Sequence, residues 1–139
     1  MTKRFFVSLI ISLFVTNVCQ GVLAKPSIEV HIVDYLPDNN VPLTFHCASK
    51  DDDLGYHHPK VGDDFHFHFL PRVFGHTLFF CHFWWGNKQA KFDVYTSNLS
   101  YNCLWDETPI TLCYWKVQGN GFFLGPSLTE GKKMHDWNE

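Results

Sequence analysis

The 139-residue sequence has little positive charge. It contains 11 Lys and Arg residues against 14 Asp and Glu residues, and its formal net charge is −3. Loss of the N-terminal signal described below removes Lys3 and Arg4, which leaves 9 basic residues against 14 acidic ones and a net charge of −5. Proteins that bind nucleic acid or anionic membranes by charge normally carry a basic excess. The charge balance therefore argues against both partners.

The common catalytic and metal-binding motifs are also missing. The sequence has no nucleophile elbow, no Gly-rich phosphate loop and no metalloprotease histidine motif. Neither a Cys-x-x-Cys pair nor a zinc-ribbon spacing occurs. A glycosidase needs only two suitably separated carboxylates, but nothing in the sequence singles out such a pair. We therefore expect a protein that is not an enzyme and that has no cofactor and no resident metal.

Only one long hydrophobic run is present, and it lies at the N-terminus. Lys3 and Arg4 precede a nearly continuous apolar stretch over residues 5–18, and small or apolar residues occupy 22–24. This is the layout of a secretory signal, and the apolar stretch is too short to span a bilayer comfortably. We expect residues 1–24 to be removed after Ala24, with Gly21 as the alternative boundary. The mature protein is then secreted, extracellular and not inserted in a membrane.

Signal removal also settles the number of cysteines. Of the 5 cysteines, Cys19 lies in the signal, which leaves Cys47, Cys81, Cys103 and Cys113 in an oxidising compartment. Two disulfides are expected, and the sequence alone allows three pairings. We favour Cys47–Cys113 with Cys81–Cys103, because Cys47 and Cys113 lie in two strand-like runs that are far apart in sequence.

The remaining residues, 25–139, form a single domain rich in aromatic side chains, which make up 17% of the sequence. Apolar residues alternate with polar ones, or run together, in short segments separated by turn residues, and residues 119–121 give a strong hairpin signal. This pattern predicts an all-β fold, an antiparallel β-sandwich with two disulfides. The tail after Gly125 is polar and aperiodic, so we expect residues 125–139 to be loose. The strand-like segments lie at residues 28–32, 43–47, 65–69, 77–85, 92–96 and 112–117.

An acidic segment follows the second of these strands. Asp51, Asp52 and Asp53 are adjacent, and three neighbouring carboxylates repel one another and cannot all be buried. We expect a solvated or partner-facing turn rather than a Ca²⁺ site, because the alternating ligands of an EF-hand loop are absent. His66 and His68, with the His57-His58 pair, could bind zinc or copper, although a solvated strand face is the more common explanation.

Two further segments suggest surface chemistry. The Trp84-Trp85 pair could stack on a sugar ring, but strand alternation predicts one core residue and one edge residue. Asn98 begins an Asn-Leu-Ser acceptor sequence on a turn-like segment, so Asn98 is a candidate glycosylation site.

Taken in order, several segments resemble the plant self-incompatibility S1 family. The string from His46 to Gly55 matches closely, with Ala48 where a basic residue is common. Asp34 stands where the family usually has Asn. The resemblance covers residues 28–123. The other matching residues are Val30, Ile32, Leu36, Gly62, Phe65, Phe67, Phe69, Phe74, Thr77, Phe79, Phe80, Cys81, Trp84 or Trp85, residues 92–95, Cys103 and residues 113–115.

The resemblance implies a small secreted plant protein with a disulfide-linked β-sandwich. The best understood members act in the pistil of field poppy, where they bind a receptor on pollen and trigger calcium signalling that stops the pollen tube. By this resemblance we expect a monomeric extracellular ligand that presents loops to a cell-surface receptor. A secreted defence or hydrolase-inhibitor protein is the alternative, and a carbohydrate-binding module is less favoured. The candidate receptor-contact residues are Lys50, Asp51, Asp52, Asp53, His57, His58, Asp63 and Asp64, and the loop at residues 98–109 is a second candidate surface.

Overall fold

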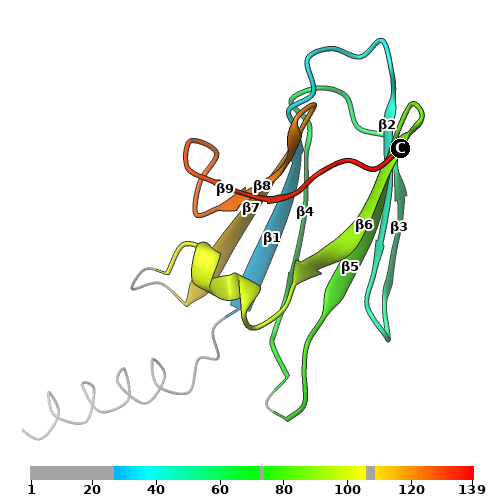
Figure 1. The fold of residues 1–139 in the computed structure, drawn as a ribbon. Coiled ribbons are helices and arrows are strands. Elements are labelled where there is room, and N and C mark those ends of the chain that lie inside the picture. Colours follow the sequence, from blue (N-terminus) through cyan, green and yellow to red (C-terminus); the bar gives the residue numbers. More distant parts are fainter. Residues whose placement is uncertain (1–26, 73, 106–108) are drawn as a thin grey trace, which may run out of the picture.

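The chain folds into two β-sheets packed face to face (Figure 1). The computed structural model describes residues 27–72, 74–105 and 109–139, so the expected signal lies outside the described residues. One sheet has five strands in the order β4-β1-β7-β8-β9, and the other has four in the order β3-β2-β5-β6. The elements are β1 Ser27–Asp34, β2 Leu43–Ala48, β3 Asp53–His57, β4 Asp64–Phe69, β5 Phe79–Trp85, β6 Lys88–Tyr95, a 3₁₀ helix η1 Leu99–Asn102, β7 Ile110–Gln118, β8 Gly121–Gly125 and β9 Lys132–His135.

The predicted all-β sandwich is confirmed, with one refinement of strand direction. Every neighbouring pair of strands is antiparallel except β1 and β7, which run parallel in the middle of the five-stranded sheet. A parallel pair needs a long crossover connection, which here includes the whole four-stranded sheet, β4 and η1. Among the described residues, no helix has the length and apolarity that crossing a bilayer requires.

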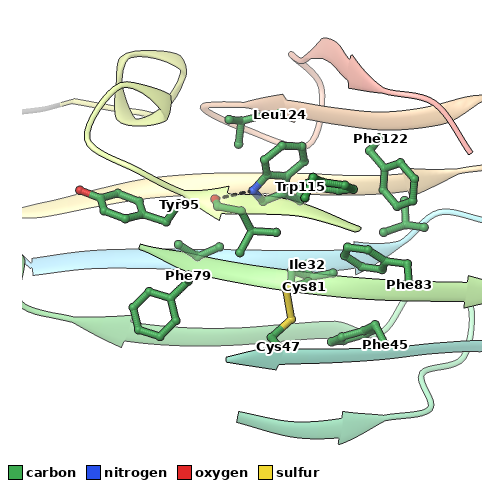
Figure 2. Packing of buried hydrophobic residues seen from close by; sticks show 14 of the residues in the cluster. Ile32, Phe45, Cys47, Phe79, Cys81, Phe83, Tyr95, Trp115, Phe122 and Leu124 are labelled. Carbon is green, nitrogen blue, oxygen red and sulfur yellow. Dashed lines mark hydrogen bonds between the residues drawn. A yellow bond between two sulfur atoms is a disulfide. The ribbon is translucent and has the colours of Figure 1, made fainter. Parts of the chain in front are cut away.

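Large aromatic rings from both sheets fill the space between them (Figure 2). Phe83 of β5 packs against Phe122 of β8 with ring centroids 4.9 Å apart, and Phe92 of β6 lies 5.1 Å from Trp115 of β7. Each contact joins one sheet to the other. The alternation of buried and exposed residues along the strands, seen in the sequence, therefore places a continuous aromatic core in the centre.

The disulfide pairing favoured from the sequence is wrong. Cys47 bonds Cys81, and Cys103 bonds Cys113. Cys47 and Cys81 are directly opposite each other on the antiparallel strands β2 and β5. Cys113 lies on β7 of the other sheet, where it holds the end of the η1 segment through Cys103. A large separation in sequence misled the prediction, because Cys47 and Cys113 lie on different sheets and each bonds a cysteine that is closer along the chain.

The expectation of a loose tail over residues 125–139 is also wrong. β9 pairs with β8, and Trp137 packs against Phe122 with ring centroids 4.5 Å apart. The backbone of Asn138 exchanges two hydrogen bonds with that of Gln89, each 2.8 Å long. β9 is a short edge strand with a register irregularity and mostly polar residues, so it lacks the alternation by which the other strands were recognised.

The strand directions divide the connecting loops between two ends of the sandwich (Figure 1). The loops at 49–52, 70–78 and 96–105 lie at one end, which we call the acidic-loop end. The connections at 35–42, 58–63, 86–87 and 119–120 lie at the opposite end. This division decides which candidate residues can act together.

Candidate functional site

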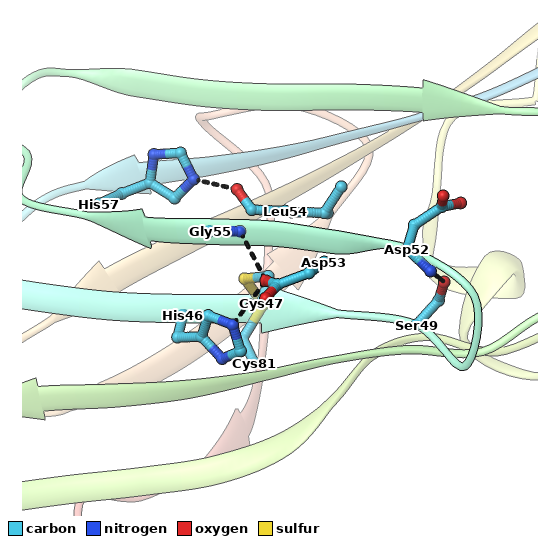
Figure 3. A network of polar contacts seen from close by, with 9 residues as sticks. All are labelled: His46, Cys47, Ser49, Asp52, Asp53, Leu54, Gly55, His57 and Cys81. Carbon is cyan, nitrogen blue, oxygen red and sulfur yellow. Dashed lines mark hydrogen bonds and ion pairs between the residues drawn. A yellow bond between two sulfur atoms is a disulfide. The ribbon is translucent and has the colours of Figure 1, made fainter.

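The acidic turn between β2 and β3 is tightly built. The Ser49 amide donates to the carbonyl oxygen of Asp52 at 2.7 Å. The Asp52 amide donates to Ser49 Oγ at 3.1 Å (Figure 3). These bonds close the turn through the backbone and one hydroxyl, so they leave the Asp52 carboxylate directed to solvent. Cys47, bonded to Cys81, anchors the turn to the core at its N-terminal side.

Of the three aspartates, Asp53 is the one whose carboxylate stabilises the local structure. Its Oδ1 accepts hydrogen bonds from the Gly55 amide at 2.9 Å and from the His46 ring Nε2 at 2.7 Å (Figure 3). The bond from Gly55, and after it the bond from His46, lowers the pKa of the Asp53 carboxyl below its ordinary value. Gly55 has φ = +84°, a conformation that suits glycine, which explains why Gly55 closes the segment. The sequence did not predict that residues 53–57 form a strand.

Asp51 faces the neighbouring loop instead. Its carboxylate forms an ion pair with the Arg72 guanidinium from the 70–78 segment. Between the two loops lies an open cleft of about 310 Å³, which has a mixed apolar and charged lining. The lining residues are Ser49, Lys50, Asp51, Asp52, Phe69, Leu70, Arg72, His76, Thr77, Leu78, Phe79 and Phe80.

Several exposed apolar side chains belong to the loops of this same end. The large hydrophobic residues that are exposed in or next to these loops are Leu70, Phe74, Leu78, Tyr101, Trp105 and Ile110. Phe74 is 90% exposed, although a phenylalanine gains nothing from contact with water. Four other exposed large hydrophobics lie elsewhere, at Tyr35, Val41, Tyr56 and Val61. Leu70 and Leu78 line the cleft beside the charged residues of the acidic turn, and apolar residues beside charged ones are typical of a surface that binds another protein.

The remaining candidate contact residues do not join the acidic turn. His57 is the last residue of β3, where its ring packs on Phe65 at 4.0 Å between centroids and donates to the Leu54 carbonyl at 2.7 Å. His58 and Asp63 lie in the connection at the opposite end, and Asp64 begins β4. The sequence grouped these residues with 50–53 because it did not show that β3 separates the two groups.

Asn98 is exposed and directly precedes η1. The segment that follows β6 lies at the acidic-loop end, so a glycan on Asn98 would stand on the 96–105 side of that end. Glycosylation of Asn98 stays a prediction.

The outer face of the four-stranded sheet carries a strip of rings. Tyr56 of β3 stacks on His46 of β2 at 4.5 Å, and His82 stacks on Trp84 of β5 at 3.8 Å. Tyr56 also faces Trp84, with ring centroids 6.1 Å apart. The tryptophan pair separates as strand alternation predicted: Trp84 lies in this strip, whereas Trp85 packs against the core.

One cluster of metal-ligand types occurs among the described residues. It consists of His31, Asp64 and His66, on the outer face of the five-stranded sheet. His57 and His58 do not belong to it, and the sequence missed His31 because a histidine within an apolar strand gave no distinct signal.

The comparisons with known proteins agree on one family. Residues 29–137 match the family model described as plant self-incompatibility protein S1. S-protein homolog 24 of Arabidopsis thaliana is 35% identical over 139 residues, covering 96% of this chain and 88% of the relative. S-protein homolog 5 of Arabidopsis thaliana is 38% identical over 80 residues. This second match spans only 58% of each protein.

The fold has a solved counterpart. A structure of SPH (self-incompatibility protein homologue) proteins, described as a widespread family of small, highly stable, secreted proteins from plants, superposes with a TM-score of 0.59. It covers 83% of this chain and 97% of that protein at 15% identity, a level that supports the fold alone. Together with the family model and the sequence relatives, this shows that the chain belongs to the plant self-incompatibility S1 family, the S-protein homologues.

Proposed function

We propose that the protein is an extracellular ligand that docks on a cell-surface receptor through its acidic-loop end. The observation that carries the proposal is the cleft between residues 49–52 and 70–78, where charged side chains stand beside exposed apolar ones. Secretion predicted from the N-terminal residues agrees with the description of SPH proteins as secreted. A receptor loop with a basic residue would meet Asp52, and an apolar residue would cover Leu70 or Phe74.

The two layers of the sandwich suit this role because they hold the loops rigidly. The Cys47–Cys81 bond fixes one side of the acidic turn, and the Cys103–Cys113 bond fixes the end of the η1 segment. Loops held before binding lose less conformational entropy on binding, which favours affinity. Function in this proposal comes from surface shape and charge, with no catalytic residue.

Neutral substitutions in the acidic turn test the proposal. The structure selects D51N/D52N and leaves Asp53 in place, because the Asp53 carboxylate holds β3 through Gly55 and His46. Purified secreted protein is added to pollen or seedling cells while cytosolic calcium is recorded. We expect the parent protein to raise calcium and the double variant to require a higher concentration. A folded D51N/D52N variant with an unchanged response would contradict the proposal.

A second candidate function rests on the ring strip of Tyr56, His46, Trp84 and His82. Flat aromatic faces can stack on the C–H face of a sugar ring, so the strip could bind a cell-wall carbohydrate. A glycan array read with the parent protein and with Trp84→Ala tests it. Binding that is lost in the variant supports carbohydrate recognition, and no binding by the parent contradicts it.

A further inference from the structure

His31 has an unusual position for a histidine. It lies in the middle of β1, on the outer face of the five-stranded sheet, and is only 8% exposed. Its register partners are His66 on β4 and Tyr114 on β7, and both rings stack on it, at 5.0 Å and 4.4 Å between centroids. The imidazole is therefore held in one orientation from both sides.

Both ring nitrogens of His31 face carboxylates. Nδ1 lies 2.8 Å from Asp64 Oδ2 and 2.9 Å from Asp64 Oδ1, and Nε2 lies 3.2 Å from Glu29 Oε2. The ligand atoms of His31, Asp64 and His66 all lie within 4.8 Å of one another. We propose that these three residues bind one divalent transition-metal ion, for which Zn²⁺ is the reference, and that Glu29 orients His31 from behind.

The donor set selects this class of ion. Two imidazole nitrogens and one carboxylate suit zinc and copper, whereas calcium and magnesium require oxygen ligands. Two atoms bound at about 2.0–2.1 Å to a tetrahedral zinc ion lie roughly 3.3 Å apart, so Nδ1 and Asp64 need to separate by only about 0.5 Å. Water would fill the fourth position, on the exposed side beside His66.

The Glu29 contact is an independent indication. A metal-bound histidine commonly donates its other ring N–H to a carboxylate, which fixes the tautomer and the ring orientation. His31 has this second partner already in place, through Nε2. The local field also favours a cation, because the carboxylates of Asp64 and Glu29 both contact the His31 ring.

Protons compete with a metal ion for imidazole and carboxylate ligand atoms, so affinity should fall as the solution is acidified. The ionisable groups around His31 are Glu29 on its own strand, Asp64, His66 and His68 on β4, and Tyr114 and Lys116 on β7. His68 is exposed and lies opposite Glu29, but it is not part of the cluster. It therefore provides a matched control for His66 on the same strand face.

Calorimetric titration of the purified secreted protein with ZnCl₂ tests the proposal, using His66→Gln and His68→Gln. Both substituted residues are exposed, so both variants should fold. We expect the parent and H68Q to bind one Zn²⁺ per chain with equal affinity, and H66Q to bind at least about tenfold more weakly. Glu29→Gln should weaken binding about tenfold as well.

Two results would overturn the proposal. One is the absence of saturable one-to-one binding by the parent protein. The other is an equal loss in H66Q and H68Q, which would indicate diffuse chelation by surface histidines. Histidine ring NMR provides a second readout: shifts on ZnCl₂ addition should centre on His31 and His66, and shifts centred on other histidines would contradict the assignment.

Discussion

The indole of Trp115 donates a hydrogen bond to the backbone carbonyl of Val94 at 2.9 Å, within the core (Figure 2). Trp115 belongs to β7 of the five-stranded sheet, and Val94 belongs to β6, an edge strand of the other sheet. A polar bond thus joins the two layers within a mainly apolar core. It also satisfies a buried carbonyl that has no further strand beside it.

Removal of this bond should be costly. Trp115→Phe keeps an aromatic ring but leaves the Val94 carbonyl without its partner and a small cavity beside it. We expect the free energy of unfolding to fall by about 2–4 kcal/mol. Guanidinium denaturation followed by tryptophan fluorescence and circular dichroism measures the change. A loss below about 0.5 kcal/mol would show that the bond between the sheets is unimportant.

The two disulfides should contribute unequally. Cys47 and Cys81 are 34 residues apart in sequence, and Cys103 and Cys113 are 10 apart. In the chain-entropy model, loops of these lengths correspond to about 3.8 and about 2.7 kcal/mol. We expect the C47A/C81A variant to be the less stable by about 1 kcal/mol in thermal or guanidinium unfolding. Peptide mapping that recovers Cys47 linked to Cys113 would contradict the structure.

The buried charge of Asp34 destabilises the folded protein, and a substitution can remove it. Asp34 is buried, and its Oδ1 accepts a hydrogen bond from the Leu36 amide at 3.0 Å. Burial, and to a lesser degree the charge of Asp63, raises the pKa of the Asp34 carboxyl, against the lowering effect of the Leu36 bond. Asparagine keeps the accepting oxygen without the charge. We therefore expect Asp34→Asn to stabilise the protein by about 1 kcal/mol or less at neutral pH.

The sign of the pH dependence follows. The pKa of Asp34 is higher in the folded state than in the unfolded state. Protonation of Asp34 therefore stabilises the folded state, and this contribution is fully present when the pH is below the pKa of the unfolded state. That contribution is lost as pH rises through the folded pKa. The advantage of D34N over the parent should therefore shrink as pH is lowered from about 7 towards about 4. Melting temperatures of both proteins across this range measure it, and a constant difference would count against the assignment.

The contribution of His135 to stability should depend on pH in the opposite direction. The His135 ring stacks on Phe92 at 4.1 Å, and burial lowers its pKa, despite the raising effects of Asp93 and Asp136. The stability associated with neutral His135 is present above the unfolded pKa and is lost as pH falls through the lowered folded pKa. We expect His135→Phe to lose less stability than the parent between about pH 7 and about pH 5. Parallel thermal melts test this, and identical slopes would disprove it.

The strands of the core could be predicted from the sequence because alternation and burial coincide there. Phe65, Phe67 and Phe69 alternate with exposed histidines both in the sequence and in β4. β3 and β9 escaped prediction for a common reason. Both are short and have few apolar residues, so their pattern resembles that of a loop, whereas the edge strands β4 and β6 show clear alternation. Trp137, which ties down the tail, lies beyond the last strand.

The site was only half visible from the sequence. Three adjacent charges revealed the acidic turn in the sequence. Arg72, which pairs with Asp51, lies 21 positions away and meets it only in the folded protein. The same holds for His31, which meets Asp64 at a separation of 33 positions. Pairings across strands depend on register and sheet order, and a single sequence carries little information on either.

The most direct test of the central claim compares two exposed apolar residues at opposite ends of the sandwich. Phe74 lies in the 70–78 loop of the acidic-loop end, and Val41 lies in the connection at the other end. Labelled secreted protein, carrying Phe74→Ser or Val41→Ser, is titrated onto responsive plant cells. Docking through the acidic-loop end predicts that F74S binds about tenfold or more weakly, while V41S binds like the parent. Equal binding by F74S and the parent, or a loss confined to V41S, would contradict the account.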